Sequence, residues 1–373
     1  MEQVNDRAYM ARALKLAWRG LFTTDPNPRV GCVLVRAGEI VGEGWHQWAG
    51  DAHAEVNALR QADVRARGAT CYVTLEPCCH RGRTPPCTEA LIEAGVVRVV
   101  AAMRDPNPKV AGQGLAQLRE AGLQVEYGLL QEEAQALNPG FVQRLVQGRP
   151  WVRCKLAMSL DGATALASGE SRWITAPPAR RDVQRWRARS SAILTGIGTV
   201  IGDDPALNVR YEELQNEVPP GFDRQPWRVI LDRKLAISEK ARLLSLPGPV
   251  LIACADGEQP KAESLRSKGA EVISLPVASE GLDLKALMAV LAAREINELH
   301  VECGARLAGS LLQAGLMDEL VLYIAPKLMG EASLGLLRLP GIQTMEDCIQ
   351  VDIKEIRAVG RDWRLVAKIL PKG

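Results

Sequence analysis

The chain has 373 residues, of which 47% are apolar and 24% charged, and its formal net charge is +2. This length predicts a globular protein of two domains, each large enough to bury its own core. Because no block of Lys or Arg stands out, the charge argues against a nucleic-acid partner. The first 20 residues mix acids and bases, unlike a secretory signal, and prolines interrupt the longest apolar stretch, 243–255, which excludes a membrane span.

The first half of the chain alternates between predicted helices and strands. At its end, Gly148 follows the last helical turn and Pro150 comes two residues later, which is typical of a helix stop. We therefore predict two domains, 1–148 and 149–373. The predicted helices are 2–20, one after His53, one from Pro85 and 131–147, and the predicted strands are 30–35, one ending at Trp45, 69–75 and 96–102.

The second half begins the alternation again, which predicts a second α/β domain. Its predicted strands are 151–157, 192–195, 227–231, 249–254, 271–274 and 299–303, and its predicted helices are 177–190, 283–294 and one after Gly304.

The nine cysteines are an odd number and are unevenly spaced along the chain. Without an export signal, this count predicts reduced thiols and a cytoplasmic location. Cys32, Cys71 and Cys254 lie in apolar segments and are most simply core residues.

His53, Cys78 and Cys87 offer three ligands for a zinc ion, one fewer than a closed structural site uses. The fourth ligand would be water, whose pKa zinc lowers from ~15.7 to about 7. Glu55 is close enough in sequence to reach that water and to move protons to a departing amine. This arrangement is the pattern of the zinc deaminases.

The predicted elements bring these side chains together. His53 and Glu55 fall on the first turn of a helix, where free N–H groups favour an anionic carboxylate. Cys78 follows a strand, and Cys87 opens a helix whose N-terminus is expected to stabilise its thiolate.

Two alternatives stay open at this stage. A closed structural zinc site would take Cys79 or His80 as its fourth ligand, and Glu55 would then be no more than a first-turn charge. For His46 and His300, the alternative is that they are ordinary hydrogen-bonded groups.

Two Pro-Asn-Pro turns, at Asn27 and Asn107, are expected at strand ends beside the zinc loops. Strand ends are where open α/β sheets bind ligands. Both asparagines are therefore candidate contacts to a polar ligand, and the interpretation that they only form turns has equal weight.

Two glycine-containing segments in the second half, 196–202 and 304–310, follow predicted strands. Strand, glycine and helix N-terminus form the geometry that binds phosphate. The first segment is one residue longer than the dinucleotide fingerprint, so each signal is weak alone. Together they indicate a dinucleotide cofactor, and Arg233 beside Lys234 favours NADP because cations could meet its 2′-phosphate.

Nine segments, in this order, resemble the family of bifunctional riboflavin-biosynthesis deaminase/reductases. They are PNPRVGC, HAEVNAL, TLEPCCHRGRTPPC, DPNP, KLAMSLDG, ASGESRWIT, DDPALNVR, VECGARLAG and DELVLYIAPKLMG. The resemblance covers nearly the whole chain, apart from about 211–226 and 255–282. It also accounts for the eight residues between Cys78 and Cys87, since the family has this long gap.

The resemblance implies an α/β protein with an N-terminal cytidine-deaminase-like three-layer domain and a C-terminal dihydrofolate-reductase-like domain. The first would use Zn²⁺ to deaminate 2,5-diamino-6-ribosylamino-4(3H)-pyrimidinone 5′-phosphate. The second would use NADPH to reduce the ribosylamino group to a ribitylamino group.

The resemblance also assigns site residues. It implies His53, Cys78 and Cys87 as zinc ligands and Glu55 as the proton shuttle. In the first domain, the implied substrate contacts are Asn27, His46, His80, Arg83 and Asn107. In the second, the implied substrate contacts are Ser171, Arg187, Leu207, Arg210 and Glu302, and the implied NADP contacts are Ala157, Trp173, Thr199, Asp203, Gly304, Ala305, Arg306, Leu307, Ala308, Gly309 and Ser310.

Three further roles follow from chemistry. Arg187 and Arg210 suit the 5′-phosphate, because a guanidinium group binds phosphate in a bidentate manner. Asp203 or Lys155 could supply the proton for the reduction, and Asp203 is preferred. The sequence does not specify assembly, for which a symmetric homodimer or a higher homo-oligomer is the default expectation.

Overall fold

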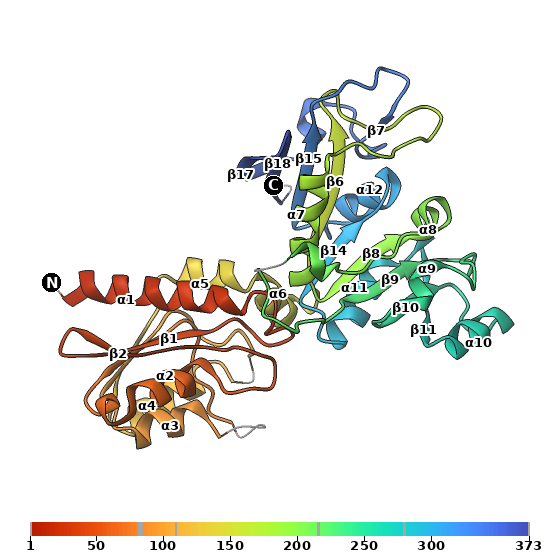
Figure 1. Ribbon diagram of the computed structural model, residues 1–373. Coiled ribbons are helices and arrows are strands. Elements are labelled where there is room, and N and C mark those ends of the chain that lie inside the picture. Colours follow the sequence, from red (N-terminus) through yellow and green to blue (C-terminus); the bar gives the residue numbers. More distant parts are fainter. Residues whose placement is uncertain (1, 81–84, 109, 215–216, 279–280, 372–373) are drawn as a thin grey trace. The chain divides into compact units, whose positions relative to one another are not determined.

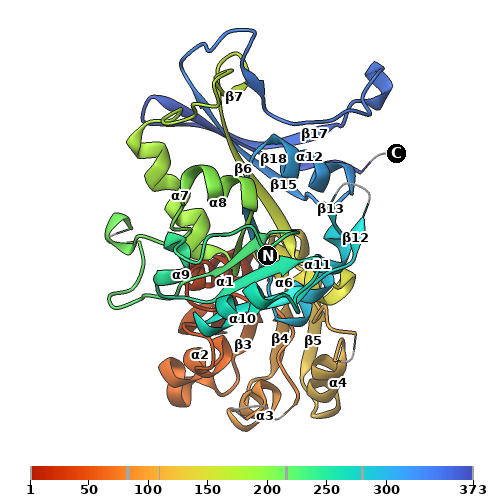
Figure 2. The same ribbon diagram turned by 90° about the vertical axis from the view of Figure 1, so that its right-hand side faces the viewer.

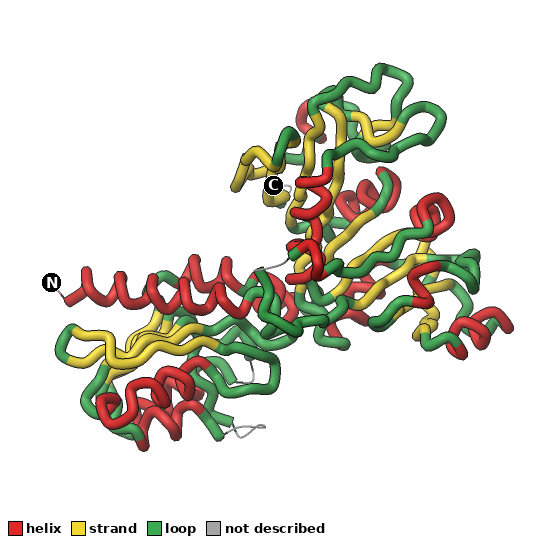
Figure 3. The backbone as a smooth tube through the Cα atoms, in the orientation of Figure 1, coloured by secondary structure: helices red, strands yellow, loops and turns green. Residues whose placement is uncertain are grey.

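The structure is a computed structural model that describes residues 2–80, 85–108, 110–214, 217–278 and 281–371. The chain forms two compact units, Met1–Gly148 and Arg149–Gly373. Each unit has one main sheet with helices on both faces (Figures 1 and 3). Among the described residues, no helix combines the length and the apolar character needed to cross a membrane.

The first unit is a three-layer α/β fold around a five-stranded sheet of order β2-β1-β3-β4-β5. β1 is antiparallel to both of its neighbours, and β3, β4 and β5 are parallel. Both faces of β1 are buried, because Cys32 and Leu34 face one core cluster and Val33 and Val35 face the other. The strands are β1 (Gly31–Arg36), β2 (Glu39–Trp45), β3 (Thr70–Val73), β4 (Arg98–Ala101) and β5 (Gln124–Tyr127).

Helices cover both faces of this sheet. α2, α3 and α4 pack on the face of Cys32 and Leu34, and α1 and α5 cover the other (Figure 1). The helices are α1 (Glu2–Ala17), α2 (Ala54–Ala62), α3 (Cys87–Glu93), α4 (Gln113–Glu120), α5 (Gln131–Leu137) and α6 (Pro139–Gln147), and short 3₁₀ turns cover Trp18–Gly20 and Asp63–Ala66.

The prediction of one helix over 131–147 is wrong. The chain leaves the helical conformation at Asn138, and Pro139 then begins α6. The Asn138 side chain accepts a hydrogen bond from the Arg29 backbone N–H at 2.8 Å and donates one to the Arg29 carbonyl at 2.9 Å. Asn138 therefore lies at the break between the two helices and anchors the loop that carries Asn27.

The second unit contains a nine-stranded sheet of order β11-β10-β9-β8-β14-β6-β15-β18-β17. The strands from β11 to β15 run parallel, and β18 and β17 are antiparallel to their neighbours. Its strands are β6 (Trp151–Ser159), β8 (Ala192–Gly196), β9 (Trp227–Leu231), β10 (Val250–Cys254), β11 (Ala270–Ser274), β14 (Glu298–Glu302), β15 (Glu319–Ala325), β17 (Val351–Val359) and β18 (Asp362–Ile369).

Helices also cover both faces of this sheet. α11 and α12 pack on one face, while α7, α8 and α10 pack on the other. Two small strand pairs, β7 with β16 and β12 with β13, lie outside the main sheet. These elements are β7 (Ala163–Ala165), β12 (Val277–Ala278), β13 (Gly281–Leu282), β16 (Leu334–Gly335), α7 (Pro177–Arg189), α8 (Ile197–Asp203), α9 (Arg242–Ser245), α10 (Pro260–Ser267), α11 (Leu284–Ala293) and α12 (Ala305–Gln313), with 3₁₀ turns at Tyr211–Glu213 and Met345–Asp347.

The strand order creates a switch point between β8 and β14. From β8 the chain continues to β9, β10 and β11 on one side, and it returns as β14 on the other side. Ligands of open α/β sheets bind beyond the carboxyl ends of strands at such a point. The sequence analysis did not predict α4, α9, α10, β5, β15, β17, β18 or the two small strand pairs as elements.

Candidate functional site

His53, Cys78 and Cys87 form the one cluster with metal-binding geometry among the described His, Cys, Asp and Glu residues. Their ligand atoms all lie within 4.8 Å of one another. His53 caps the start of α2, Cys78 follows β3, and Cys87 is the first residue of α3. Two helix starts and one strand end therefore meet at this cluster.

The distances fit a zinc ion. His53 Nδ1 lies 3.2 Å from Cys87 Sγ and 3.5 Å from Cys78 Sγ. Ligand bonds of about 2.0–2.3 Å in a tetrahedral site place neighbouring ligand atoms roughly 3.6–3.8 Å apart. One imidazole nitrogen and two thiols are also the donors that zinc prefers, and three of them leave one position open.

Glu55 lies beside the cluster and is only 3% exposed. Burial raises the pKa of its carboxyl to about 7, although His53 acts in the opposite direction. The sequence analysis expected the start of the helix to favour the charged carboxylate, but the desolvation of Glu55 is the larger effect. A carboxyl group that titrates near neutral pH can both take up and release a proton.

The expected stabilisation of the Cys87 thiolate by its own helix is a further difference. The first N–H of α3, that of Cys87, points to Cys78 Sγ at 3.4 Å. The side-chain hydrogen bond with the Cys87 thiol lowers the pKa of Cys78 to about 4, and the backbone N–H of Cys87 adds to this effect. The hydrogen bond with Cys78 and burial raise the pKa of Cys87. The first N–H of α3 therefore helps to stabilise the thiolate of Cys78 and not that of Cys87.

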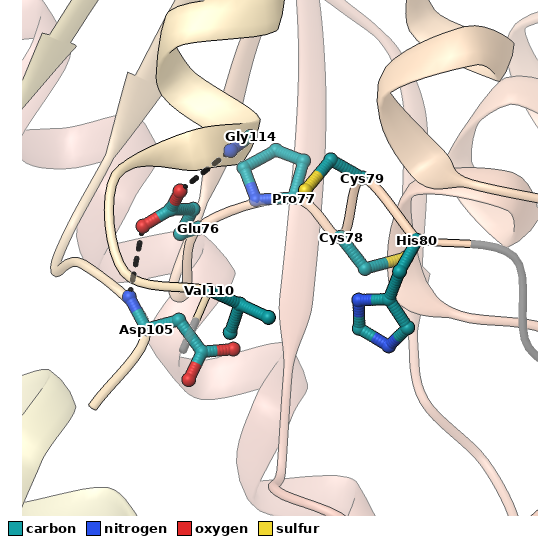
Figure 4. Close-up of a pocket in the computed structure, with 8 residues that line it drawn as sticks. All are labelled: Glu76, Pro77, Cys78, Cys79, His80, Asp105, Val110 and Gly114. Carbon is teal, nitrogen blue, oxygen red and sulfur yellow. Dashed lines mark hydrogen bonds between the residues drawn. The ribbon is translucent and has the colours of Figure 1, made fainter. Parts of the chain in front are cut away.

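Neither Cys79 nor His80 belongs to the cluster. In Figure 4 the sulfur atoms of Cys78 and Cys79 point to different sides of the loop. Burial raises the pKa of the Cys79 thiol, which keeps it protonated. Cys79 is thus positioned away from the metal ligands. Arg83, the other predicted contact in this loop, lies outside the described residues.

Asn27 and His46 are brought together at the edge of the cluster. Asn27 Nδ2 lies 3.1 Å from His46 Nε2, while His46 Nδ1 lies 3.2 Å from the carbonyl of Ala52. The rings of His46 and His53 meet edge to face, with their centroids 5.5 Å apart. His46 therefore links the Asn27 loop to His53, the first metal ligand. The sequence analysis had left the role of His46 open.

His80 lines a pocket beside the metal cluster, together with residues from a loop after β4 (Figure 4). Glu76, which sequence reasoning missed, fixes this loop. Its buried carboxylate accepts backbone hydrogen bonds from Asp105 at 3.0 Å, Gly112 at 2.9 Å, Gly114 at 2.9 Å and Leu115 at 3.3 Å. The loop also carries Asn107, whose N–H donates to the Asp105 carboxylate at 2.8 Å. The lining residues are Glu76, Pro77, Cys78, Cys79, His80, Asp105, Val110 and Gly114.

In the second unit, the predicted cofactor segments lie at the switch point of the sheet. Thr199 and Asp203 belong to α8 after β8, Arg233 follows the neighbouring strand β9, and Gly304 caps α12 after β14. Within the last segment Gly304 and Arg306 are exposed, and Ala305, Leu307 and Ser310 are partly buried. Ala308 and Gly309 are buried, and a Cβ at Gly309 would lie 2.1 Å from the Arg338 carbonyl. The side-chain positions of Ala308 and Gly309 are therefore packed against the rest of the protein.

The loop after β7 reaches α8. Arg172 donates to the backbone carbonyl of Asp203 at 2.6 Å and pairs with its carboxylate at 3.0 Å. This contact places Ser171 and the exposed Trp173 beside Asp203. Ala157 lies on β6, partly buried against α7.

Arg187 and Glu302, both predicted to contact substrate, bind each other. The Glu302 carboxylate accepts from Arg187 Nε at 2.5 Å and from Nη2 at 2.9 Å, and Nη1 donates to the Asn208 carbonyl at 2.8 Å. Burial acts to raise the pKa of Glu302, but the charge of Arg187 outweighs it and lowers that pKa well below its usual value. All three donor groups of Arg187 are therefore used within the protein.

The remaining substrate candidates differ in accessibility. Leu207 is 2% exposed, so only its backbone can face a ligand. Arg210 is 38% exposed at its side chain and pairs with Glu213 at 2.5 Å. Of the two arginines, Arg210 is the better placed for phosphate.

Lys155 and His300 lie near the Arg187–Glu302 pair. Burial lowers the pKa of Lys155, and Glu302 partly counteracts this effect. His300 is fully buried, and its Nε2 lies 3.3 Å from the Glu302 carboxylate without the alignment of a hydrogen bond. Burial lowers the pKa of His300, so its ring is neutral.

Comparison with known proteins accounts for both units. Residues 3–103 match the family described as the cytidine and deoxycytidylate deaminase zinc-binding region, and residues 150–365 match the RibD C-terminal domain. The first unit is thus cytidine-deaminase-like, and the second has the RibD reductase fold, consistent with a dihydrofolate-reductase-like architecture.

Full-length relatives agree. The riboflavin biosynthesis protein RibD of Escherichia coli is 53% identical over 96% of this chain and 98% of its own. That of Haemophilus influenzae is 51% identical over 99% of this chain and 98% of its own. Among solved structures, Acinetobacter baumannii RibD superposes with a TM-score of 0.91 and 42% identity, over 99% of this chain and 100% of its own. A Thermotoga maritima diaminohydroxyphosphoribosylaminopyrimidine deaminase/5-amino-6-(5-phosphoribosylamino)uracil reductase gives 0.85 and 32%, over the same shares.

Proposed function

The chain belongs to the RibD family of bifunctional riboflavin-biosynthesis enzymes, and from this premise we propose which residues perform each reaction. It is both a hydrolase and an oxidoreductase, with a zinc-dependent deaminase domain and an NADPH-dependent reductase domain. We propose that domain 1–148 deaminates 2,5-diamino-6-ribosylamino-4(3H)-pyrimidinone 5′-phosphate. We propose that domain 149–373 then reduces the ribosylamino group to a ribitylamino group.

The observation that supports the deaminase assignment best is the placement of Glu55 beside the three-ligand cluster. His53, Cys78 and Cys87 would hold the zinc ion, which activates a water molecule when it is bound. Glu55 would take the proton from that water and pass it to the leaving amine. Its burial suits this task, because a carboxyl group with a pKa near 7 exchanges protons readily at neutral pH.

Substrate binding in this domain follows from the same geometry. Asn27 and His46 would contact polar atoms of the pyrimidine ring beside the cluster. His80 would contact the rest of the substrate from the pocket that it lines. We propose Asn107 and Arg83 as further substrate contacts. Glu76 would hold these loops in place without touching the substrate.

For the reductase, we propose that NADPH binds at the switch point between β8 and β14. Thr199, Trp173, Ala157, Arg233 and the start of α12 would line its site. Arg210 and Ser171 would bind the 5′-phosphate of the substrate. Arg187 would keep Glu302 ionised and oriented toward the sugar, with Leu207 contributing its backbone.

The source of the proton is revised in favour of Lys155. The opened sugar presents an imine, which takes a hydride from the cofactor at carbon and a proton at nitrogen. The Asp203 carboxylate is held by an ion pair with Arg172, so it is already engaged within the protein. Burial lowers the pKa of Lys155, which makes its ammonium group the better acid.

We further propose a cytoplasmic location and a homo-oligomeric state, with a small-molecule substrate and neither a nucleic-acid nor a membrane partner. All nine cysteines are free thiols, which suits a reducing compartment.

The replacement Glu55→Gln tests the assignment of the deaminase. The variant should bind one zinc ion and lose deamination by roughly 10²–10⁴-fold, because the proton carrier is removed. NADPH oxidation on an already deaminated substrate should persist. Glu120→Gln, an exposed change in α4 of the same domain, should leave both activities intact. Loss of both activities in a folded Glu55→Gln protein would contradict the assignment.

A further inference from the structure

The loop between β7 and α7 carries two residues of the proposed reductase site, Ser171 and Trp173. Figure 2 shows β7 at the top of the second unit, beside the segment that follows β15. Every residue from 166 to 173 is exposed, so this stretch has no side chain anchored in a core. Apart from a short turn, which the Leu166 N–H closes on the Glu170 carbonyl at 2.9 Å, its position therefore depends on polar contacts from neighbouring elements.

Lys327 holds the backbone of this loop at Trp173. Its Nζ donates a hydrogen bond to the Trp173 carbonyl at 2.8 Å, although the two residues are 154 positions apart in the sequence. Lys327 follows β15, and its own carbonyl accepts from the Leu160 N–H, just after β6, at 2.8 Å. The lysine therefore extends from a segment that is itself bonded to the end of a central strand.

Asp161 fixes the same segment a few residues further on. Its carboxylate accepts from the Met329 N–H at 2.8 Å and from the Gly330 N–H at 2.9 Å. A hydrogen bond from the Ser159 hydroxyl, together with these two N–H groups, lowers the pKa of Asp161 to about 2. The carboxylate is thus ionised at neutral pH and holds the backbone from which Lys327 projects.

Arg180 of α7 holds the side chain of the same tryptophan. Its guanidinium carbon lies 4.5 Å from the centroid of the Trp173 ring, and its Nη1 donates to the Thr175 carbonyl at 2.8 Å. A cation over the face of an indole is attracted by its π electrons. Trp173 is nevertheless 64% exposed, so it retains surface for a ligand. One cation therefore holds the carbonyl of this tryptophan, and another holds its ring.

We propose that Lys327 and Arg180 are positioning residues of the reductase, which hold Trp173 where it contacts NADPH and do not touch the cofactor themselves. This inference rests on the proposed function, in which Trp173 lines the NADPH site. Because the tryptophan is in place before the cofactor arrives, binding has less loop ordering to offset. Loss of either cation should therefore weaken the binding of NADPH and leave the reaction of the bound cofactor nearly unchanged.

The test is a double-variant cycle on the full-length protein, with the KM for NADPH and kcat measured on an already deaminated substrate. Trp173→Ala should raise this KM at least about tenfold, as expected for the loss of one aromatic stacking contact. Lys327→Met and Arg180→Met should each raise it about three- to tenfold, with kcat changed by less than about twofold. Lys327→Arg should retain most of the affinity, because a guanidinium can donate to the same carbonyl.

The combined variants distinguish positioning from direct contact. Added to Trp173→Ala, neither Lys327→Met nor Arg180→Met should raise the KM for NADPH further, because the side chain that they position is gone. Lys240→Met and Arg181→Met replace exposed cations of the same unit and should leave the KM unchanged. Thermal unfolding of each variant checks that the fold is retained.

The outcomes separate this inference from the function on which it rests. An unchanged KM in Trp173→Ala would contradict the proposed NADPH site and the positioning role together. A raised KM in Trp173→Ala, with an unchanged KM in both single cation variants, overturns the positioning role alone. So does a further rise when either cation variant is added to Trp173→Ala, because it shows that the cation itself contacts the cofactor.

Discussion

Two glutamates, one in each unit, are held in opposite ways. No cation among the described residues is bonded to Glu55, and burial raises its pKa to about 7. Glu302 is partly buried, and Arg187 binds both of its oxygens and lowers its pKa. The first carboxyl group is suited to carry a proton, and the second to remain charged. The comparison shows that burial alone does not decide the role of an acid, because the neighbouring cation does.

The largest expected effect concerns the metal ligands beside Glu55. Cys78→Ser should abolish zinc binding and lower deamination by at least about 10³-fold, because the metal activates the water. Cys79→Ser is the matched control for the metal and should keep one zinc ion, since Cys79 lies outside the cluster. Metal analysis of both purified variants decides, and loss of zinc from Cys79→Ser would show that the ligands were assigned wrongly.

The next effect tests which group protonates the substrate near Glu302. Lys155→Met should lower NADPH oxidation by roughly 10²–10⁴-fold, as expected for the loss of a general acid. Asp203→Asn should lower it by less than about tenfold, because its carboxylate pairs with Arg172. Single-turnover rates with saturating NADPH measure both, and the reverse ranking would restore Asp203 as the proton donor.

A third prediction concerns the ion pair between Glu302 and Arg187. Glu302→Gln leaves the Arg187 guanidinium buried without a counter-charge, which should cost about 3–5 kcal/mol of unfolding free energy in the reductase unit. The double variant Glu302→Gln with Arg187→Met should regain a large part of it, because no charge then remains unpaired. Urea unfolding, monitored by a signal from the reductase unit, measures this difference in unfolding free energy. Equal stability of the single variant and the wild type would mean that the pair contributes little.

Glu55 should make the stability of the metal-free deaminase unit depend on pH. Because the folded pKa of Glu55 is raised, its protonated form stabilises the metal-free deaminase unit below about pH 4.3, and this contribution is lost as the pH rises to about 7. The unfolding free energy that Glu55→Gln gains over the wild type, measured on chelator-treated protein, should therefore be larger at pH 8 than at pH 5. The difference between the two pH values should reach up to about 3 kcal/mol. Parallel stability profiles of the two proteins would argue against a raised pKa.

The smallest expected effect concerns the cofactor. Arg233→Ala should raise the KM for NADPH about five- to tenfold and leave that for NADH unchanged, because a single exposed ion pair with the 2′-phosphate is lost. Lys240→Ala, another exposed cation of the same unit, serves as the control. An unchanged ratio of the two KM values would exclude the 2′-phosphate role of Arg233.

The parts of the site that are local in sequence were predictable, and those that depend on long-range contacts were not. His53, Glu55 and Cys78 lie in short motifs whose chemistry follows from residue type and spacing. Glu76 is in the same motif, but its bonds go to a loop about 30–40 residues later, so no local signal shows its role. The bonds of Asn138 go to Arg29, 109 residues away, whereas the helix break itself has a local cause that the sequence analysis missed, because Pro139 disfavours the helical conformation at Asn138.

The roles of the arginine residues show the same limit of prediction from sequence. Sequence reasoning assigns Arg187 and Arg210 alike to phosphate, because both side chains have the right chemistry. Only the structure shows that the Arg187 guanidinium forms an ion pair with Glu302, whereas the Arg210 side chain stays partly exposed. The edge position of β17 is equally invisible in sequence, because strand order is a property of the whole sheet.

The contact between Gly114 and the Pro77 carbonyl limits how this enzyme could be engineered. A Cβ at position 114 would lie 2.1 Å from that oxygen, so no side chain fits there without displacing the segment that leads to Cys78. Enlarging the pocket for bulkier pyrimidines by remodelling the 105–115 loop would therefore disturb metal affinity as well. Designers should instead vary Val110, which lines the pocket without bonding to Glu76.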